Sequence, residues 1–234
     1  MATAVGYAHP EYLAETDWLA ERLGDPGICI VDTDPVASYH RAHIPGAVVV
    51  PDNYEKDPDT GQVNVVSPEQ CAKMMEALGI GDDTLVVAYD HSRSLYAGRL
   101  WWVLNYYGHD KVKVLNGGWK KWLEEGRPLS TSPTRGKEEA TFTPRPVPSL
   151  LVTAERLKET YQDPDVVVWD VRTLAEYTGE NTRGNRRAGH IPGAHHLEWS
   201  ELMDEGDHTF KPAREMRELL EAKGIVPEKE VLAH

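Results

Sequence analysis

Two cysteines are the residues of this sequence best suited to covalent chemistry, because a thiolate is a strong nucleophile. Cys29 lies inside the apolar run 28–32, where a cysteine usually packs as a small hydrophobic residue. Cys71 lies in the first turns of a helix that we expect over 68–78, and a helix N-terminus can lower the pKa of a thiol. No histidine or arginine surrounds Cys71 in sequence. We therefore predict a buried, packed thiol at Cys29, and helix packing or an inert surface thiol at Cys71.

The histidines form two groups that could suggest a metal site: His40 with His43, and His190 with His195 and His196. Zinc sites usually combine histidines with cysteine or carboxylate ligands at characteristic spacings, and neither group has such partners. His43 and His190 each precede the same tetrapeptide, Ile-Pro-Gly-Ala. We therefore predict a structural, hydrogen-bonding role for these histidines and no metal. The sequence has no glycine-rich phosphate loop either, so we expect no nucleotide and no other cofactor.

A polar, glycine-containing segment over 176–190 carries Arg183, Arg186 and Arg187. Guanidinium groups bind the oxygens of anions in pairs, so this segment could steer an anionic ligand. It could equally be a solvated loop. Trp199 follows the segment and could form the wall of a pocket or pack in the core.

Composition limits the classes of partner. The chain has 234 residues, 40% hydrophobic and 27% charged, with a formal net charge of −13. This acidic balance argues against binding to nucleic acid or to an anionic membrane surface. Two cysteines do not make a disulfide framework, the N-terminus lacks a secretory signal, and no apolar run approaches the roughly 18 residues of a membrane span. These features predict a soluble, cytoplasmic protein.

The sequence contains an internal repeat. AHIPGA at 42–47 recurs as GHIPGA at 189–194, and the apolar run ICIVD at 28–32 recurs as VVVWD at 166–170. Continuous β-branched runs of this kind are typical of buried parallel strands. The same order of elements in both copies predicts that the chain contains the same fold twice.

Each copy continues with a helix and a second strand, over 67–90 and 211–234. Alternating strands and helices predict an α/β fold, with two domains that each have a central, mostly parallel sheet flanked by helices. We place the first domain at 10–128, a Pro-, Ser- and Thr-rich linker at 129–150, and the second domain at 151–234. A proline near the start and a glycine at the end delimit each helix: Pro68 and Gly79, Pro212 and Gly224.

Both β-branched runs end on an aspartate, Asp32 in the first copy and Asp170 in the second. The carboxyl edge of an α/β sheet is a usual place for a binding site. Because the aspartate is present in both copies, we favour a shared structural role. In the second copy Arg172 follows closely, and we predict an ion pair between Asp170 and Arg172 that supports a neighbouring site.

Four segments together resemble a known family. AETDWLAERLGDP at 14–26, LNGGWKKWLEEGRP at 115–128, the two HIPGA boxes and LEWSEL at 197–202 are similar to the tandem-domain rhodanese (thiosulfate sulfurtransferase) family, which includes 3-mercaptopyruvate sulfurtransferases. The resemblance covers nearly the whole chain. It implies a transferase that moves a sulfane sulfur from thiosulfate to a thiophilic acceptor, cyanide or a thiol, through a cysteine persulfide.

The resemblance also implies where the nucleophile lies. In this family the first domain is inactive and the second carries a catalytic cysteine directly after the strand that corresponds here to EVLAH, 230–234. The cysteine is therefore expected directly after His234, so that this chain alone holds no catalytic residue and its second domain stops before the active loop. The corresponding residue of the first copy is Asp90, and a carboxylate cannot carry a persulfide sulfur.

The same resemblance makes Arg187, Arg186 and Trp199 the candidate substrate-binding residues. Members of the mitochondrial type have a substrate-binding arginine before an aromatic residue early in this segment, whereas here Glu176 precedes Tyr177. That difference favours thiosulfate as the donor. Two alternatives stay open: a 3-mercaptopyruvate sulfurtransferase, and a non-catalytic rhodanese-like binding module. We also expect the missing C-terminal segment of the second domain to accompany the chain as a physically associated piece.

Overall fold

The computed structural model describes residues 6–52, 65–136 and 139–234. The chain forms two compact units. We call His9–Leu150 together with Gly206–Thr209 the N-terminal unit, and Met1–Ala8, Leu151–Glu205 and Phe210–His234 the C-terminal unit. Within the described ranges, every helix is too short or too polar to span a bilayer. The cytoplasmic location stays a prediction.

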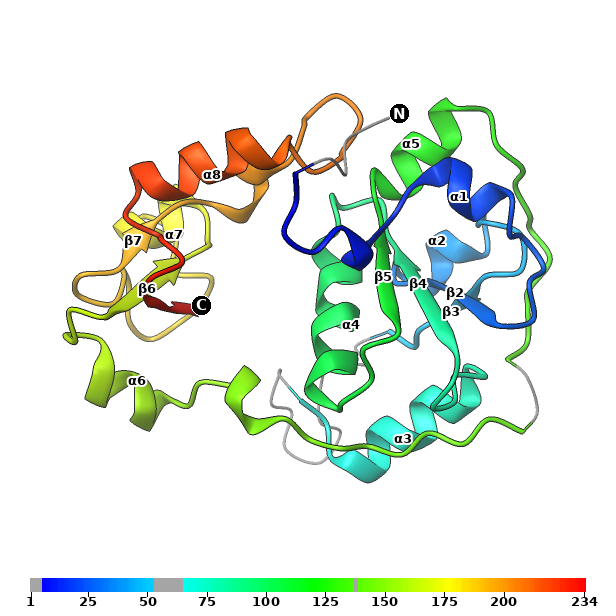
Figure 1. The fold of residues 1–234 in the computed structure, drawn as a ribbon, viewed down its shortest axis with the longest axis horizontal. Coiled ribbons are helices and arrows are strands. Elements are labelled where there is room, and N and C mark those ends of the chain that lie inside the picture. The colour runs from blue at the N-terminus through cyan, green and yellow to red at the C-terminus, as the bar shows by residue number, and fades with distance from the viewer. Residues whose placement is uncertain (1–5, 53–64, 137–138) are drawn as a thin grey trace. The chain divides into compact units, whose positions relative to one another are not determined.

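The N-terminal unit is a parallel five-stranded sheet with helices on both faces (Figure 1). The strand order is β1-β5-β4-β2-β3. The strands are β1 (Leu13–Ala14), β2 (Ile28–Asp32), β3 (Val48–Val49), β4 (Leu85–Tyr89) and β5 (Val112–Leu115). The helices are α1 (Thr16–Ala20), α2 (Val36–Tyr39), α3 (Pro68–Ala77), α4 (Leu95–Tyr106) and α5 (Gly118–Glu124), with 3-10 turns η1 (Pro10–Tyr12) and η2 (Pro148–Leu150).

One face of this sheet packs against α1, α2 and α5. Their buried side chains Leu19, Tyr39 and Trp122 form one core cluster with Ile30 and Val87 of the central strands. Helix α4 lies on the opposite face, along β4 and β5 (Figure 1). This packing fixes the carboxyl ends of β2 and β4, from which the loops of interest start.

Helix α3 shows that the local signals in the sequence were sufficient to locate it. Ser67 accepts a hydrogen bond from the Gln70 backbone N–H, while the Gln70 side chain accepts one from the Ser67 N–H, which together form a capping box. Gly79 has a φ of 77°, which lets the chain leave the helix. The expected helix over 68–78 is present as Pro68–Ala77.

The C-terminal unit contains α6 (Ala154–Thr160), β6 (Val166–Asp170), α7 (Leu174–Thr178), β7 (His195–His196), the 3-10 turn η3 (Trp199–Leu202), α8 (Ala213–Ala222) and β8 (Glu230–Ala233). Its parallel strands have the order β7-β6-β8, which matches β3-β2-β4 of the N-terminal unit. The register matches as well, since Val31 pairs with Val48 in one copy and Trp169 with His195 in the other. The repeat predicted from the HIPGA boxes is therefore also a structural repeat.

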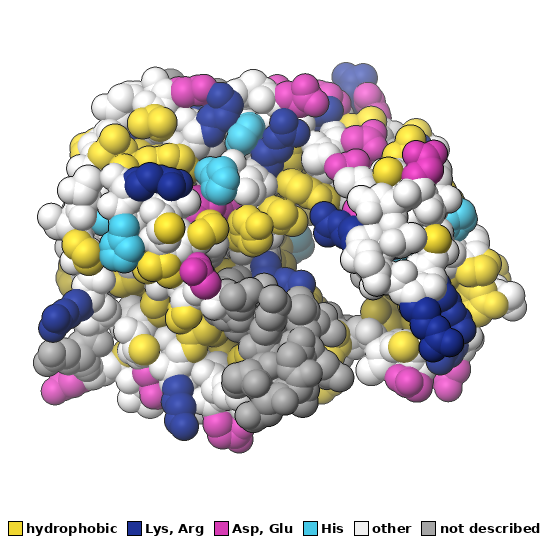
Figure 2. All heavy atoms as spheres, turned by 180° about the vertical axis from the view of Figure 1, so that it is seen from behind, with side chains coloured by type: hydrophobic (Ala, Val, Ile, Leu, Met, Phe, Trp, Pro, Cys, Tyr) yellow, Lys and Arg dark blue, Asp and Glu magenta, His cyan; other side chains and the backbone are white. Residues whose placement is uncertain are grey.

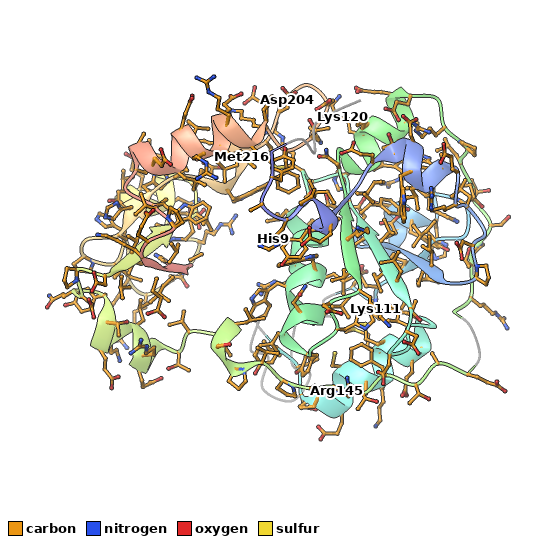
Figure 3. The ribbon with its side chains drawn as sticks, in the orientation of Figure 1. His9, Lys111, Lys120, Arg145, Asp204 and Met216 are labelled. Atoms are coloured by element: carbon orange, nitrogen blue, oxygen red, sulfur yellow. The ribbon has the colours of Figure 1, made fainter. Side chains whose placement is uncertain are left out.

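The two copies differ in how far the sheet extends. Strand β4 has β5 on its outer side, whereas β8 is the last strand of its sheet in the described part of the chain. Helix α8 has no buried residue, and its apolar side chains line a groove of about 430 Å³ in the C-terminal unit, together with Tyr7 and Trp169. Figure 3 labels Met216, one of these side chains.

The segment 129–150, predicted to be a linker, follows the N-terminal unit closely. The Asp82 backbone N–H donates to the Thr141 carbonyl at 3.0 Å, and the Arg145 N–H donates to the Tyr107 carbonyl at 2.8 Å. Phe142 is buried. Apart from η2 and an isolated bridge at Ser130, the described part of the segment has no helix or strand. The proposed domain limits 10–128, 129–150 and 151–234 stay a prediction.

The NGGW sequence generates a stability prediction. Gly118 has a φ of 51°, and a Cβ at this position would overlap the carbonyl oxygen of Asp90. Gly118→Ala should therefore lower the free energy of unfolding by about 2–4 kcal/mol, through the left-handed backbone and the clash. Gly98→Ala is the matched control, since Gly98 lies inside α4 with nothing within 4 Å of its added Cβ. We expect that change to be neutral or to stabilise by up to about 1 kcal/mol. Equal effects in urea denaturation would contradict the prediction.

Candidate functional site

Asp170 is the residue around which the other groups of the site in the C-terminal unit are arranged. It ends β6, and its side chain is fully buried. Its carboxylate accepts hydrogen bonds from the Arg172 backbone N–H at 3.1 Å, from Nε at 2.9 Å and from Nη2 at 2.5 Å. Arg172 Nη2 also donates to the Gly189 carbonyl at 3.1 Å, so the ion pair ties the end of β6 to the start of the GHIPGA box. The geometry of the predicted Asp170–Arg172 pair is present; its supporting role stays a proposal.

His234 completes this group. Its Nε2 atom lies 3.4 Å from Asp170 Oδ2, and it has no hydrogen bond in the described residues. Burial raises the pKa of Asp170, but the hydrogen bonds from Arg172 and the nearby His234 outweigh burial and hold that pKa below its usual value. Burial lowers the pKa of His234. At neutral pH the group is therefore an ionised carboxylate, a guanidinium and a neutral imidazole.

The HIPGA histidines bind the backbone, as expected for a structural role. His190 Nδ1 lies 2.8 Å from the Tyr177 carbonyl, the two rings stack at 3.7 Å, and the Tyr177 hydroxyl donates to the Ala194 carbonyl at 3.0 Å. Tyr39 and His43 repeat the arrangement in the first copy, with 2.8 Å between His43 Nδ1 and the Tyr39 carbonyl and ring stacking at 3.8 Å. Over the described ranges, no three His, Cys, Asp or Glu side chains gather as a metal site would require.

The arginines of the segment 176–190 have different surroundings. Arg183 Nε lies 3.3 Å from Glu176 Oε1, and the Glu176 carboxylate is buried and also accepts from the Thr173 hydroxyl at 2.7 Å. Glu176 therefore caps α7 and holds Arg183. Arg186 and Arg187 are exposed and form no ion pair with any described residue.

Trp199 begins η3 directly beside the end of β6. Its backbone N–H donates to the Val171 carbonyl at 3.1 Å, and its side chain is half-buried. Trp199 is therefore bonded to the residue between Asp170 and Arg172, and the Gly189 carbonyl to the Arg172 side chain. The structure provides no direct contact from Arg186 or Arg187 to the Asp170–Arg172 pair, and the substrate-binding roles of these residues stay a proposal.

The first copy contains a set of backbone donors around Asp90, the residue that corresponds to the expected cysteine. Asp90 is buried, and its carboxylate accepts four backbone hydrogen bonds: Oδ1 from Ser92 and Ser94 at 2.8 and 2.9 Å, and Oδ2 from Tyr96 and Ala97 at 2.8 Å each. We call this set of four N–H groups the amide cradle. It spans the turn after β4 and the first turn of α4, so the positive end of the α4 dipole adds to the four donors.

Backbone conformation explains why the residue types around Asp90 do not signal the amide cradle. Arg93 and Ser94 have φ values of 57° and 65°, and left-handed residues that are neither glycine nor asparagine give no clear sequence signal. Burial raises the pKa of Asp90, while the backbone hydrogen bonds from Ala97, Ser94 and Ser92 oppose that shift. The amide cradle is an anion site, and a side chain of the protein fills it.

Neither cysteine has the surroundings of a reactive thiol. Cys71 is completely buried, and burial raises its pKa to about 12. Cys29 is only partly buried, contrary to the expected buried thiol, because it lies at the start of β2, where its Sγ is 3.6 Å from the Leu78 carbonyl. Thiolates are the reactive form of cysteine, so Cys71 is suited to packing and not to catalysis.

The Rhodanese-like domain family model matches residues 15–125 and 153–234. The chain belongs to the rhodanese family. A sulfur carrier protein of Thermus thermophilus, TtuD, is 37% identical over 98% of this chain and 84% of the relative. A putative thiosulfate sulfurtransferase of Mycobacterium tuberculosis, SseA, is 35% identical over 93% of this chain and 75% of the relative.

Solved structures agree with this assignment. The 3-mercaptopyruvate sulfurtransferase SseA of Escherichia coli superimposes with a TM-score of 0.85 at 27% identity, over 95% of this chain and 87% of that one. An anaerobic ergothioneine biosynthesis enzyme from Chlorobium limicola matches with a TM-score of 0.83 at 25% identity, over 97% of this chain and 61% of that one. The predicted family, the α/β fold with parallel sheets and the repeat are confirmed, and the function is that of a sulfurtransferase.

The Asp170–Arg172 pair generates a pH-dependent prediction. Arg172→Ala leaves the buried Asp170 carboxylate without its main partner, which should cost about 3 kcal/mol of stability near pH 7. Because the pKa of Asp170 is depressed in the folded protein, the pair contributes fully above the usual carboxyl pKa of 3.8, and its contribution is lost as the pH falls through the lower folded value. The difference between wild type and variant in urea denaturation should therefore shrink in acid.

Arg186→Ala is the matched control for this change, since Arg186 is exposed and forms no ion pair with the described residues. It should change the free energy of unfolding by less than about 0.5 kcal/mol at any pH. If Arg172→Ala is as stable as Arg186→Ala at pH 7, the Asp170–Arg172 pair does not stabilise the end of β6.

Proposed function

We propose that this protein transfers a sulfane sulfur from thiosulfate to a thiophilic acceptor, cyanide or a thiol, through a cysteine persulfide. The amide cradle supports this proposal. The Thr33 N–H donates to the Tyr89 carbonyl at 3.0 Å, and the Val171 N–H donates to the His234 carbonyl at 3.1 Å, so Tyr89 and His234 are equivalent strand ends. The position after His234 therefore corresponds to Asp90, and there we propose a cysteine in place of the carboxylate.

A thiol in such a cradle would be ionised, because four amide donors and a helix N-terminus stabilise the thiolate. The thiolate attacks the outer sulfur of thiosulfate, the S–S bond breaks, and sulfite leaves with the bonding electron pair. Cyanide or a thiolate then attacks the outer sulfur of the persulfide, and the enzyme thiolate leaves. The two half-reactions are covalent catalysis and give ping-pong kinetics.

The groups around Asp170 suit an anionic donor. Arg186 and Arg187 are exposed, with no ion pair in the described residues, so their guanidinium groups are available to thiosulfate oxygens. Trp199 supplies an apolar wall beside the strand end. Asp170 holds Arg172 in place, and the pair would support the loop that follows His234.

The donor is the point on which related proteins differ. Glu176 occupies the position of the arginine that the mitochondrial type uses for its substrate, and it is buried in the cap of α7 and bonded to Thr173. This observation favours thiosulfate, in keeping with the name of the Mycobacterium tuberculosis relative. The Escherichia coli structure, titled as a 3-mercaptopyruvate sulfurtransferase, supports the alternative donor. The name of the Thermus relative, a sulfur carrier, favours a persulfide that is handed to a further acceptor.

We also propose that a further polypeptide segment covers the open edge of β8 and the apolar side of α8. In the N-terminal unit, β5 pairs with β4, the strand equivalent to β8, and α4 packs on both strands. Positions equivalent to Met216 and Leu220 are Cys71 and Met75, which are completely buried there. A segment with a helix followed by a parallel strand would bury the groove of the C-terminal unit in the same way.

Persulfide mapping tests the proposed function. Protein incubated with thiosulfate and alkylated should show an added sulfur of about 32 Da on the peptide that follows His234 and none on Cys29 or Cys71. The Cys29→Ala/Cys71→Ala double variant should retain its rate of thiocyanate formation. We expect a higher kcat/KM with thiosulfate than with 3-mercaptopyruvate. A persulfide on Cys29 or Cys71, or no persulfide at all, would contradict the proposal, and the latter result would favour a non-catalytic binding module.

A further inference from the structure

A second site is suggested by the topology of the N-terminal unit. Strands β2 and β4 are neighbours in the sheet, but the chain continues from β2 to β3 on one side and from β4 to β5 on the other. In open α/β sheets, ligands bind in the crevice that such a reversal creates at the carboxyl ends of the strands. A cavity of about 210 Å³ lies there, lined by residues that include Asp34, Arg41, His91 and Trp119.

The carboxylates of this cavity are already satisfied by the protein. Asp32 accepts hydrogen bonds from the Tyr89 hydroxyl at 2.7 Å and from the Asp34 backbone N–H at 2.9 Å. Asp34 accepts from the His91 backbone N–H at 3.1 Å, and its Oδ1 lies 2.5 Å from His91 Nδ1. These contacts use the acceptor oxygens and orient the imidazole of His91, so the carboxylates are not left to bind a cation.

Two further polar groups of the cavity, the Arg41 guanidinium and the Trp119 indole, are donors. Arg41 Nη2 donates to Ser38 Oγ at 2.9 Å, and the guanidinium forms no ion pair with the residues that the structure describes. Trp119 has no hydrogen bond from its indole N–H among those residues, and its ring stacks near Tyr89, with centroids 6.2 Å apart. A guanidinium fork beside an indole N–H matches the oxygens of a small anion.

We propose that this cavity binds a small oxyanion, a short carboxylate or a sulfur oxyanion, between Arg41 and Trp119. The site is non-covalent, because Asp90 fills the neighbouring amide cradle and Cys71 is buried. The proposal does not depend on the proposed sulfur transfer, since all of its residues lie in the N-terminal unit. Figure 2 shows His, Lys and Arg side chains, together with Asp and Glu side chains, on one face of this unit.

The experiment is an NMR titration of the indole N–H resonances, with Trp119→Phe to assign Trp119. Sodium sulfite, thiosulfate and acetate are added separately, at constant ionic strength against sodium chloride. We expect a saturable shift of the Trp119 indole signal with at least one of the three anions and none with chloride. A shift of the Trp119 signal with sulfite or thiosulfate but not with acetate would define a sulfur-oxyanion site. A shift with acetate but with neither sulfur anion would define a carboxylate site.

Variants separate this site from any anion site in the C-terminal unit. Arg41→Ala should weaken the binding seen at Trp119 about tenfold or more, because a charge-assisted hydrogen bond is lost. Arg41→Lys should weaken it less, and Arg186→Ala should leave it unchanged. The proposal is overturned if none of the anions shifts the Trp119 signal beyond the chloride control, or if Arg41→Ala binds as tightly as the wild type. Loss of the shift in Arg186→Ala would overturn it as well.

Discussion

The four backbone hydrogen bonds to the Asp90 carboxylate are the interaction on which the rest of the site depends. They form because β4 ends at the carboxyl edge of the sheet and two left-handed residues, Arg93 and Ser94, turn the amides of the following chain inward. The helix α4 then starts with its positive end towards the same point. A buried anion at position 90 thus joins the sheet to the helix, and its chemical identity decides whether the copy can carry sulfur.

The pKa of a second aspartate also differs between the copies. This aspartate ends β2 in the first copy and β6 in the second. Asp32 meets the hydroxyl of Tyr89 in the first copy, and burial raises its pKa to about 6. Asp170 meets Arg172 and His234 in the second, where the arginine holds its pKa below the usual value. The backbone geometry is the same, but burial raises the pKa of Asp32, whereas Arg172 holds the pKa of Asp170 below its usual value. The repeat therefore gives the aspartate beside the strand end that we assign to catalysis a stronger preference for its charged form.

The sequence predicted the parts of the fold that rest on local chemistry. The HIPGA boxes, the strand aspartates and the Asp170–Arg172 pair involve residues close in sequence or repeated in both copies, so their types and spacing were informative. The amide cradle rests on left-handed backbone at Arg93 and Ser94, which their side chains do not signal. The ion pair between Arg183 and Glu176 depends on tertiary contacts, and so does the cavity at Arg41. The partial exposure of Cys29 depends on its place near the start of β2.

The most direct test of this account replaces the carboxylate that fills the amide cradle by a thiol. In Asp90→Cys, combined with Cys29→Ser, the pKa of the new thiol should lie well below that of the also buried Cys71, because the four amides and the helix end stabilise the thiolate. The thiolate absorbance near 240 nm, followed against pH, measures that pKa, and Cys71 does not interfere because burial raises its pKa to about 12. A pKa as high as that of Cys71, which burial alone sets, would show that the amides do not stabilise an anion at position 90.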